Sequence, residues 1–491
     1  MTATTAATAA GVSAGRTVVR RAPGKLFVAG EYAVVEPGNP AILVAVDRYI
    51  TVTVTGTAGE SGSTGTPDGP GNLDGPGASN EPCGPGGPGS PAGPGSPGGP
   101  GSARAPHVSN RPRGSGASSA PGNPSGSGTP DNLDGPGTPN EPATPTTLTA
   151  PDVVISSDLI SRPVAWRWRE GRLVAHGYDG GPGDSGSGSE GDGDGSRARD
   201  ALAYVVSAVE TVAALVAERG LGVPALRVSV RSALHEGGRK YGLGSSGAVT
   251  VAAVDAVAGF CGVELSAGER YRLAMLAGAR IDPKGSGGDL AASAWGGWIL
   301  YRAPDRDFVL DLARRVGIGR ALAAPWPGHT VRRLPAPAGL RLEVGWTGEP
   351  VSTASLVAGL HRRGRPDGAA RGRYTTASNH LVEAAAAALE RGDGAGLLEQ
   401  IRAARRELAR LDEAVGLGIF TDRLTRLCEA AEAAGGAAKP SGAGGGDCGI
   451  ALLDAAADRH ICQVRRQWSA AGVQPLPVRP AAREPGRNRH T

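Results

Sequence analysis

The chain has 491 residues, with 51 Lys and Arg against 47 Asp and Glu and a formal net charge of +4. This small charge provides no broad basic surface, so the composition argues against a nucleic-acid-binding protein. The five cysteines are widely spaced and form no CxxC pair, which predicts neither a zinc site nor a disulfide framework and fits a reducing cytoplasm. The N-terminus lacks the pattern of a signal peptide, and we expect no apolar stretch of the roughly 18 residues that span a membrane.

Two segments are too poor in large apolar side chains to build a core. Residues 56–150 and 177–200 consist mainly of Gly, Pro and small polar residues, so ordering them would cost more conformational entropy than burial returns. We expect both to be disordered insertions, and residues 1–15 and 481–491 to be disordered tails. The remaining residues suffice for two compact domains.

Strand and helix patterns are mixed along the rest of the chain. Apolar runs and apolar alternation predict strands at Val18–Arg21, Leu26–Ala29, Ile42–Val54, Leu226–Val230, Leu340–Trp346 and Gly449–Leu453. Helical periodicity and capping signals predict helices at Ala201–Arg219, Ala248–Gly259, 374–391, 396–414 and 419–434, and one that begins at Ser266. Strands and helices do not alternate strictly, so the predicted fold class is α+β.

Lysine is rare in this chain. Its four lysines each lie in or beside a glycine-rich loop: Lys25 in APGKLFVAGEY, Lys240 in KYGLGSSGAVT, Lys284 in PKGSGGD and Lys439 in KPSGAGGGD. An ammonium on a flexible stem suits phosphate oxygens, and a glycine-rich turn exposes backbone N–H groups to an anion. The pattern predicts a phosphate-handling site.

The loop KYGLGSSGAVT leads into a helix of small residues, whose N-terminus favours negative charge. Gly242, Gly244 and Gly247 free the backbone. Ser245 and Ser246 offer hydroxyls to phosphate or to Mg²⁺. The loop therefore suits the triphosphate of a nucleotide such as ATP.

The same loop satisfies GxGxxG, the dinucleotide-binding pattern. That pattern should follow its strand at once, whereas Arg231–Tyr241 intervene here. No GxxxxGK[ST] sequence is present, which excludes a P-loop enzyme. Both observations favour a different kind of phosphate site.

Three other positions carry candidate chemistry. Asp289, five residues after Lys284, could act as a base, orient an acceptor or cap a helix. Lys25 and Glu31 flank a tight turn. They could belong to the phosphate site, or they could form a Lys–Glu ion pair at the surface that has only a structural role. KPSGAGGGDCGIALL forms a second anion-binding loop before a strand.

These loops, in this order, resemble the signature motifs of the GHMP superfamily of small-molecule kinases. The segments GKLFVAGEYAVVEPG, KYGLGSSG, VGWTGEPVST and KPSGAGGGDCGIAL are most similar to the members that act on phosphomevalonate. The resemblance implies a ribosomal S5 domain 2-like N-terminal domain over residues 16–330 and a ferredoxin-like C-terminal domain over residues 331–480, with a site between them.

The resemblance also implies residue roles. Lys25 and Asp289 would flank the transferred phosphoryl group, and Ser245 or Ser246 would bind Mg²⁺. Residues implied to hold ATP are Lys240, Gly242, Leu243, Gly244, Ser245, Ser246 and Gly247. Residues implied to hold the substrate are Lys25, Ser286, Thr353, Lys439, Ser441, Gly442 and Ala443.

The implied reaction is transfer of the ATP γ-phosphoryl group to (R)-5-phosphomevalonate in the mevalonate route to isoprenoids, by a cytoplasmic monomer or homodimer. Mevalonate kinases carry a metal-binding Glu about ten residues before the catalytic Asp, where this chain has Gly278, Ala279 and Arg280. That departure favours the phosphorylated substrate. The alternatives are a mevalonate kinase, a diphosphomevalonate decarboxylase and a catalytically silent metabolite sensor.

Overall fold

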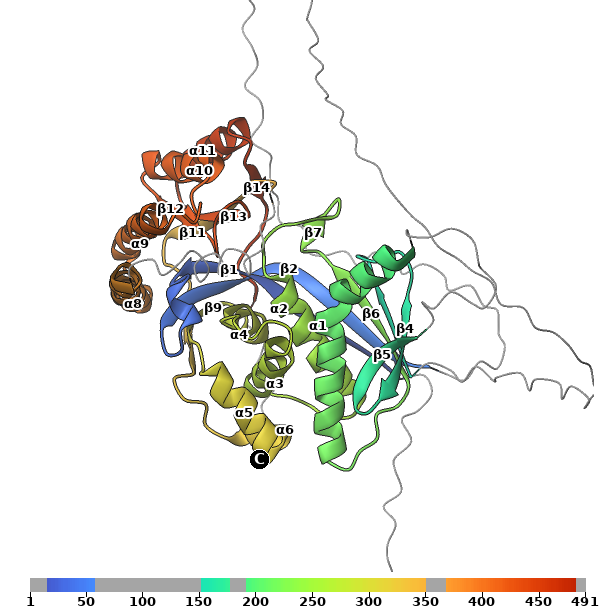
Figure 1. Cartoon of the computed structure of the whole chain (residues 1–491). Helices are drawn as coiled ribbons and strands as arrows, with labels where there is room; N and C mark the ends of the chain where they lie inside the picture. Colours follow the sequence, from blue (N-terminus) through green and yellow to red (C-terminus); the bar gives the residue numbers. More distant parts are fainter. Residues whose placement is uncertain (1–15, 58–151, 177–190, 350–367, 483–491) are drawn as a thin grey trace, which may run out of the picture. The chain divides into compact units, whose positions relative to one another are not determined.

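The computed structural model describes residues 16–57, 152–176, 191–349 and 368–482 (Figure 1). The predicted tail at 1–15, nearly all of the predicted insertion at 56–150, and Thr353 lie outside these ranges. The described chain mixes helices with two main β-sheets, as the α+β prediction requires.

The larger sheet has eight strands in the order β10-β9-β2-β6-β3-β4-β5, with β1 paired to β2. All of its pairs are antiparallel except β3 with β6. The first two strands are long, β1 (Thr17–Ala29) and β2 (Pro40–Gly56), and they cross the middle of Figure 1. The others are β3 (Val153–Ser157), β4 (Val164–Arg169), β5 (Arg172–His176), β6 (Leu226–Ser232), β9 (Trp298–Arg302) and β10 (Thr330–Leu334).

The pattern of buried and exposed residues along β2 indicates which faces of the sheet are covered. Residues 40–46 are all buried, so both faces of the strand are covered there. From Ile50 to Val54 buried and half-buried residues alternate, as expected where only one face meets the core. The sequence predicted this strand because its second half shows the same alternation.

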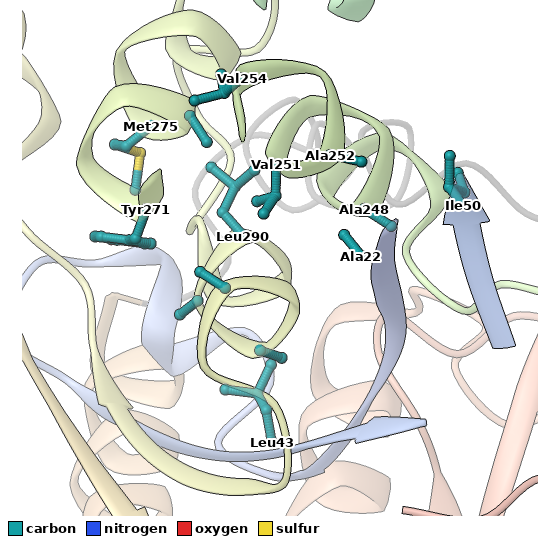
Figure 2. Packing of buried hydrophobic residues seen from close by; sticks show 14 of the residues in the cluster. Ala22, Leu43, Ile50, Ala248, Val251, Ala252, Val254, Tyr271, Met275 and Leu290 are labelled. Carbon is teal, nitrogen blue, oxygen red and sulfur yellow. The ribbon is translucent and has the colours of Figure 1, made fainter. Parts of the chain in front are cut away.

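Helices α1 (Gly191–Glu218), α2 (Ser245–Phe260) and α4 (Gly288–Trp295) pack on strands of the larger sheet, and α3 (Ala267–Ala279) packs on these three helices. Helix α2 lies among them and packs on β1, β2, α1, α3 and α4. Its small Gly, Ala and Val residues let these neighbours approach closely. Figure 2 shows Ala248, Val251, Ala252 and Val254 among the buried hydrophobic residues of the core. Helix α3 begins with the predicted capping box of Ser266 and Glu269. Two shorter helices follow, α5 (Arg306–Val316) and α6 (Ile318–Ala323).

Helix α1 differs from its prediction in length and in character. It begins at Gly191, ten residues before the predicted start at Ala201. Its segment Asp200–Glu218 is long and apolar enough to cross a membrane, so the expectation that no such stretch exists was wrong. Most of that segment is buried inside the protein, where α1 packs on α2 and α3. The apolar residues therefore serve the core.

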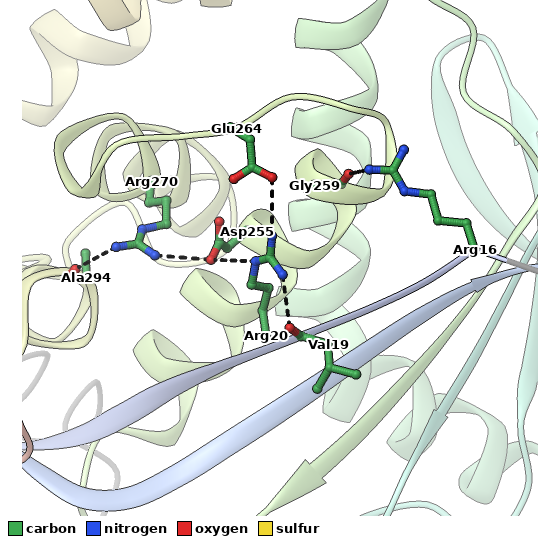
Figure 3. A network of polar contacts seen from close by, with 8 residues as sticks. All are labelled: Arg16, Val19, Arg20, Asp255, Gly259, Glu264, Arg270 and Ala294. Atoms are coloured by element: carbon green, nitrogen blue, oxygen red, sulfur yellow. Dashed lines mark hydrogen bonds and ion pairs between the residues drawn. The ribbon is translucent and has the colours of Figure 1, made fainter. Parts of the chain in front are cut away.

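Asp255 is a charged residue buried in α2, and two arginines neutralise it (Figure 3). Its carboxylate lies 3.3 Å from Arg20 Nε on β1 and 3.1 Å from Arg270 Nη1 on α3. Arg270 also donates to the Ala294 carbonyl at 3.3 Å. These contacts join β1, α2, α3 and α4. Removing one partner would leave an uncompensated buried charge, which would destabilise the fold.

The smaller sheet is antiparallel, in the order β12-β13-β11-β14. Alternate residues of β13 face two different clusters: Ile450 and Leu452 join the main core, while Ala451 and Leu453 pack with α10 and α11. Its strands are β11 (Leu340–Trp346), β12 (Ala437–Pro440), β13 (Cys448–Asp454) and β14 (Gln474–Leu476). Its helices are α8 (Gly368–Arg391), α9 (Gly394–Val415), α10 (Asp422–Ala433) and α11 (Asp458–Ala470).

Two predicted boundaries shift in the structure. The predicted domain boundary at residues 330 and 331 falls inside strand β10, which pairs with β9 of the larger sheet. The predicted tail begins too early, because Ala481 is buried and its N–H donates to the Ala45 carbonyl at 2.8 Å. After β14 the chain thus returns to β2 of the larger sheet.

Candidate active site

Lys25 lies on β1, directly against the glycine loop that precedes α2. Its backbone N–H donates to the Leu243 carbonyl at 2.8 Å, and its side chain is 8% exposed. A Cβ placed on Gly244 would lie 2.8 Å from Lys25 Cε. Only glycine therefore leaves room for the lysine stem to pass the loop.

The loop itself depends on left-handed backbone. Gly242 and Gly244 have φ of 77° and 74°, values that L side chains rarely adopt, and Gly244 is the N-cap of α2. The helix begins at Ser245, so the backbone N–H groups of its first turn are free to meet an anion. Gly247 is buried in this first turn.

Asp289 approaches the same helix end from α4. A Cβ on Gly247 would lie 2.5 Å from Asp289 Oδ2. Asp289 sits in the first turn of α4, behind Gly287, whose φ is 73°. Two glycine loops thus bring Lys25 and Asp289 to the N-terminal ends of α2 and α4.

A pocket of about 70 Å³ opens at this point. Ser246, Gly247 and Asp289 line it, as do Asp282 and Tyr204. Burial raises the pKa of the Asp289 carboxyl, the Lys25 ammonium opposes that rise, and the Asp282 carboxylate adds to it. Burial, together with the carboxylates of Asp289 and Asp282, raises the pKa of Tyr204 to about 12.

The loop after β12 reaches Lys25 from the smaller sheet. Ser441 Oγ accepts the Phe27 N–H at 2.9 Å, and the Ala443 carbonyl accepts the Tyr32 hydroxyl. A Cβ on Gly442 would lie 3.9 Å from Lys25 Nζ. The structure therefore brings the predicted residues Ser441, Gly442 and Ala443 to the same place as Lys25.

None of the four lysines is among the residues that line the pocket, and the other three differ from Lys25 in their surroundings. Lys439 has no exposed surface, and its ammonium donates to the Glu31 carboxylate and to the Pro440 carbonyl. Lys240 is exposed on the hairpin of β7 (His235–Glu236) and β8 (Arg239–Lys240). Lys284 is also exposed. Of the four, only Lys25 lies against both Asp289 and the loop before α2.

Sequence reasoning missed Asp282. The positions where mevalonate kinases would carry a carboxylate offer none here: Gly278 and Ala279 line the pocket, while Arg280 Nη1 lies 3.6 Å from Glu210. Asp282 supplies a carboxylate from the loop between α3 and α4. The available signal was its position in DPKGSGGD, at the opposite end of the loop from Asp289.

The oxygen donors around the pocket suit Mg²⁺. Hydroxyl and carboxylate oxygens are its preferred protein ligands, and a nucleotide's phosphates usually complete the shell. Within the described ranges no group of three or more His, Cys, Asp or Glu could hold a metal ion. This sparse set fits a metal that arrives with a nucleotide better than a metal held by the protein alone.

Comparison with known proteins places this geometry in a family. Residues 203–297 match the family model of the GHMP kinases N terminal domain, and residues 385–470 match that of the GHMP kinases C terminal domain. A phosphomevalonate kinase from Streptomyces sp. strain CL190 is 54% identical over 466 residues, which cover 95% of this chain and 98% of the relative. A mevalonate kinase from Thermococcus gammatolerans is 31% identical over 57% of this chain and 73% of its own length.

The fold agrees with these matches. The structure of Streptococcus pneumoniae phosphomevalonate kinase in complex with phosphomevalonate and AMPPNP aligns with a TM-score of 0.63 at 20% identity, over 94% of this chain and 99% of that one. Alone, that likeness shows only a shared fold. Together with the near full-length relative it leads to one conclusion: the chain belongs to the GHMP kinase family.

Proposed function

We propose that the chain transfers the ATP γ-phosphoryl group to the phosphate of (R)-5-phosphomevalonate, giving (R)-5-diphosphomevalonate and ADP in the mevalonate route to isoprenoids. GHMP kinases are ATP-dependent phosphotransferases, and this chain is one of them. The observation that carries the choice of substrate is the 54% identity to a phosphomevalonate kinase over nearly the full length of both chains. The mevalonate kinase relative matches at 31% over little more than half of this chain.

The chemistry of the acceptor determines what the site must do. The second pKa of a phosphate monoester is about 6, so at neutral pH the acceptor is already mostly a dianionic nucleophile. It scarcely needs a general base. The larger obstacle is repulsion between two anionic phosphates, which fixed positive charge and backbone N–H groups must offset.

Lys25 and Asp289 take different roles in this account. Lys25, held between two glycine loops, neutralises the phosphoryl group as it moves between the two reactants. Asp289 fixes the Lys25 ammonium and the acceptor in place more than it removes a proton. A Cβ on Gly244 would lie 2.8 Å from Lys25 Cε and 3.4 Å from Asp289 Cβ, and this proximity supports an electrostatic interaction between the two side chains.

The loop Gly242–Gly247 would hold the ATP phosphates. Its glycines and the N-terminus of α2 offer backbone N–H groups, and the exposed Lys240 lies at its entrance. Ser245, Ser246 and Asp282 would hold Mg²⁺, which would supply positive charge to offset the negative charge of the phosphates. Asp282 joins this set because it lines the pocket with Ser246.

The substrate would bind where the loop after β12 meets Lys25. We assign Ser286, Ser441, Gly442 and Ala443 to the mevalonate portion; Thr353 remains a sequence-based assignment outside the described residues. The enclosed position of Lys439 supports an indirect role, in which it holds Glu31 and the loop that follows β12. We infer a cytoplasmic enzyme, monomeric or homodimeric, with neither nucleic acid nor membrane as a partner.

Release of ADP by the purified protein tests the proposal. Mevalonate, (R)-5-phosphomevalonate and (R)-5-diphosphomevalonate are offered separately with ATP and Mg²⁺. We expect rapid turnover with phosphomevalonate alone. Turnover with mevalonate would indicate a mevalonate kinase, turnover with diphosphomevalonate and release of CO₂ a decarboxylase, and no turnover a silent binding protein.

A further inference from the structure

Two tyrosines without exposed surface lie behind the loop that carries Asp289. Tyr271 comes from α3 and Tyr301 from β9. Their hydroxyl oxygens are 2.9 Å apart, and the Tyr301 hydroxyl donates to the Ser286 carbonyl at 2.5 Å. Neither tyrosine lines the pocket, so a sequence search for substrate contacts would pass over both.

The direction of this hydrogen-bond chain follows from counting protons. A carbonyl can only accept, so Tyr301 uses its single proton on Ser286. The hydrogen bond between the phenols must then be donated by Tyr271. Hydrogen bonds in such a chain polarise and strengthen one another in a buried setting.

The far end of the chain is also fixed. The Tyr271 ring stacks on His329, with centroids 4.7 Å apart and planes 10° from parallel. His329 Nδ1 lies 3.1 Å from the Arg302 carbonyl and must donate to it. Burial lowers the pKa of His329 to about 4, so the ring is neutral at physiological pH. Tyr271 therefore cannot turn away from Tyr301 without unstacking.

The chain holds the backbone that leads into α4. A Cβ on Gly287 would lie 2.0 Å from Met275 Cε and 3.2 Å from the Tyr301 hydroxyl, so this backbone is pressed against both side chains. Ser286 Oγ accepts the Gly288 N–H at 3.3 Å. Asp289 follows directly, and Figure 2 shows Tyr271 and Met275 in the same cluster as its neighbour Leu290.

We propose that Tyr301, supported by Tyr271, is a positioning residue for phosphoryl transfer. Its hydroxyl fixes the Ser286 carbonyl and through it the backbone that places Asp289 at the pocket. The kinetic test of this role rests on the proposed function, because it measures turnover of phosphomevalonate. The role itself is inferred from the contacts of these residues. Because the residue acts through another, its loss should lower kcat more than it changes the affinity for ATP.

The test compares Tyr301→Phe, Tyr271→Phe, the double variant and the control Ser207→Ala. Ser207 Oγ is buried and donates to the Ala277 carbonyl at 2.8 Å, so the control deletes the same kind of bond without touching the loop that carries Ser286 and Asp289. All kinetics are measured at a temperature where each variant is fully folded. Wild-type turnover of phosphomevalonate is confirmed first, so that failure of the proposed function is recognised separately.

We expect Tyr301→Phe to lower kcat about 10- to 100-fold, as small displacements of reacting groups do, with KM for ATP within about twofold of wild type. Tyr271→Phe should cost about two- to tenfold, since Tyr301 keeps its bond to Ser286 but loses its donor. The double variant should match Tyr301→Phe. Ser207→Ala should keep wild-type kcat despite a comparable fall in Tm.

Wild-type kcat in Tyr301→Phe, or an equal loss of kcat in Ser207→Ala, would reduce the tyrosine chain to a structural contact and overturn the proposal. If Tyr301→Phe does not fold, Tyr271→Phe decides the matter. A two- to tenfold loss of kcat then supports the proposal, and an unchanged kcat overturns it.

Discussion

The Lys439 ammonium and the Glu31 carboxylate form an ion pair with 0% and 3% of their side chains exposed, although the two residues lie 408 positions apart in the chain. Glu31 follows β1 of the larger sheet and Lys439 belongs to β12 of the smaller one. The Tyr374 hydroxyl donates to the Glu31 carbonyl at 2.7 Å and adds α8 to the junction. The pair therefore fastens the two sheets together just behind Lys25.

Breaking this pair should destabilise the protein strongly. Lys439→Met leaves Glu31 as a buried charge without its partner and should cost about 3–5 kcal/mol in urea unfolding. The double variant Glu31→Gln/Lys439→Met should recover much of that loss. If Lys439→Met instead unfolds like wild type and only raises KM for phosphomevalonate, Lys439 contacts the substrate, as the family resemblance implies.

The pKa of Asp289 predicts a stability change with pH. Burial raises this pKa above its unfolded value, so at neutral pH, where the unfolded chain carries an ionised carboxylate, burial of this group costs the folded state free energy. That cost disappears as pH falls below the unfolded pKa of about 4. Asp289→Asn should therefore have a higher Tm than wild type at pH 7, with the two converging near pH 4. A Tm difference that grows on acidification would contradict the assignment.

Gly247 should tolerate no side chain. Gly247→Ala places a Cβ 2.5 Å from Asp289 Oδ2, which should displace the carboxylate and lower kcat by about 100-fold. The matched control is Gly268→Ala in the first turn of α3, where a Cβ meets nothing within 4 Å. The control should keep full activity and gain up to about 1 kcal/mol of stability. Equal activities in the two variants would show that Asp289 can move without loss.

Asp282 should govern the demand for Mg²⁺. Asp282→Asn removes a carboxylate from the pocket, so the Mg²⁺ concentration for half-maximal rate should rise about tenfold or more. Asp305→Asn, at the N-cap of α5, is the control for losing a carboxylate elsewhere. A titration with MgCl₂ at fixed ATP measures the Mg²⁺ concentration for half-maximal rate in each variant. Identical titration curves for the two variants would show that Asp282 does not bind Mg²⁺.

The sequence predicted the elements whose signals are local. The alternation in β2, the capping box of Ser266 and Glu269 and the glycine loops each depend on a few neighbouring residues, and each is present in the structure. The short strands β3 and β9 were missed because a short apolar run does not distinguish a strand from a segment of buried helix, and β10 was missed because it carries two arginines and little apolar pattern.

The site was only partly predictable for a related reason. Glycine loops indicate where backbone meets an anion, but whether a lysine beside such a loop faces the anion depends on contacts from distant strands. Lys25 on β1 and Lys439 on β12 both lie beside glycine-rich segments, yet Glu31 encloses only the second. Tyr301 had no local signal, because its role depends on a hydrogen bond to Ser286 across the fold.

We propose that fixed positive charge, more than proton removal, drives transfer between the two anionic phosphates. The direct measurement is kcat of Lys25→Ala and Asp289→Asn with (R)-5-phosphomevalonate at neutral pH. We predict a loss of about 10³-fold for Lys25→Ala and of no more than about 10²-fold for Asp289→Asn. The reverse order, with Asp289→Asn the slower enzyme, would contradict this account.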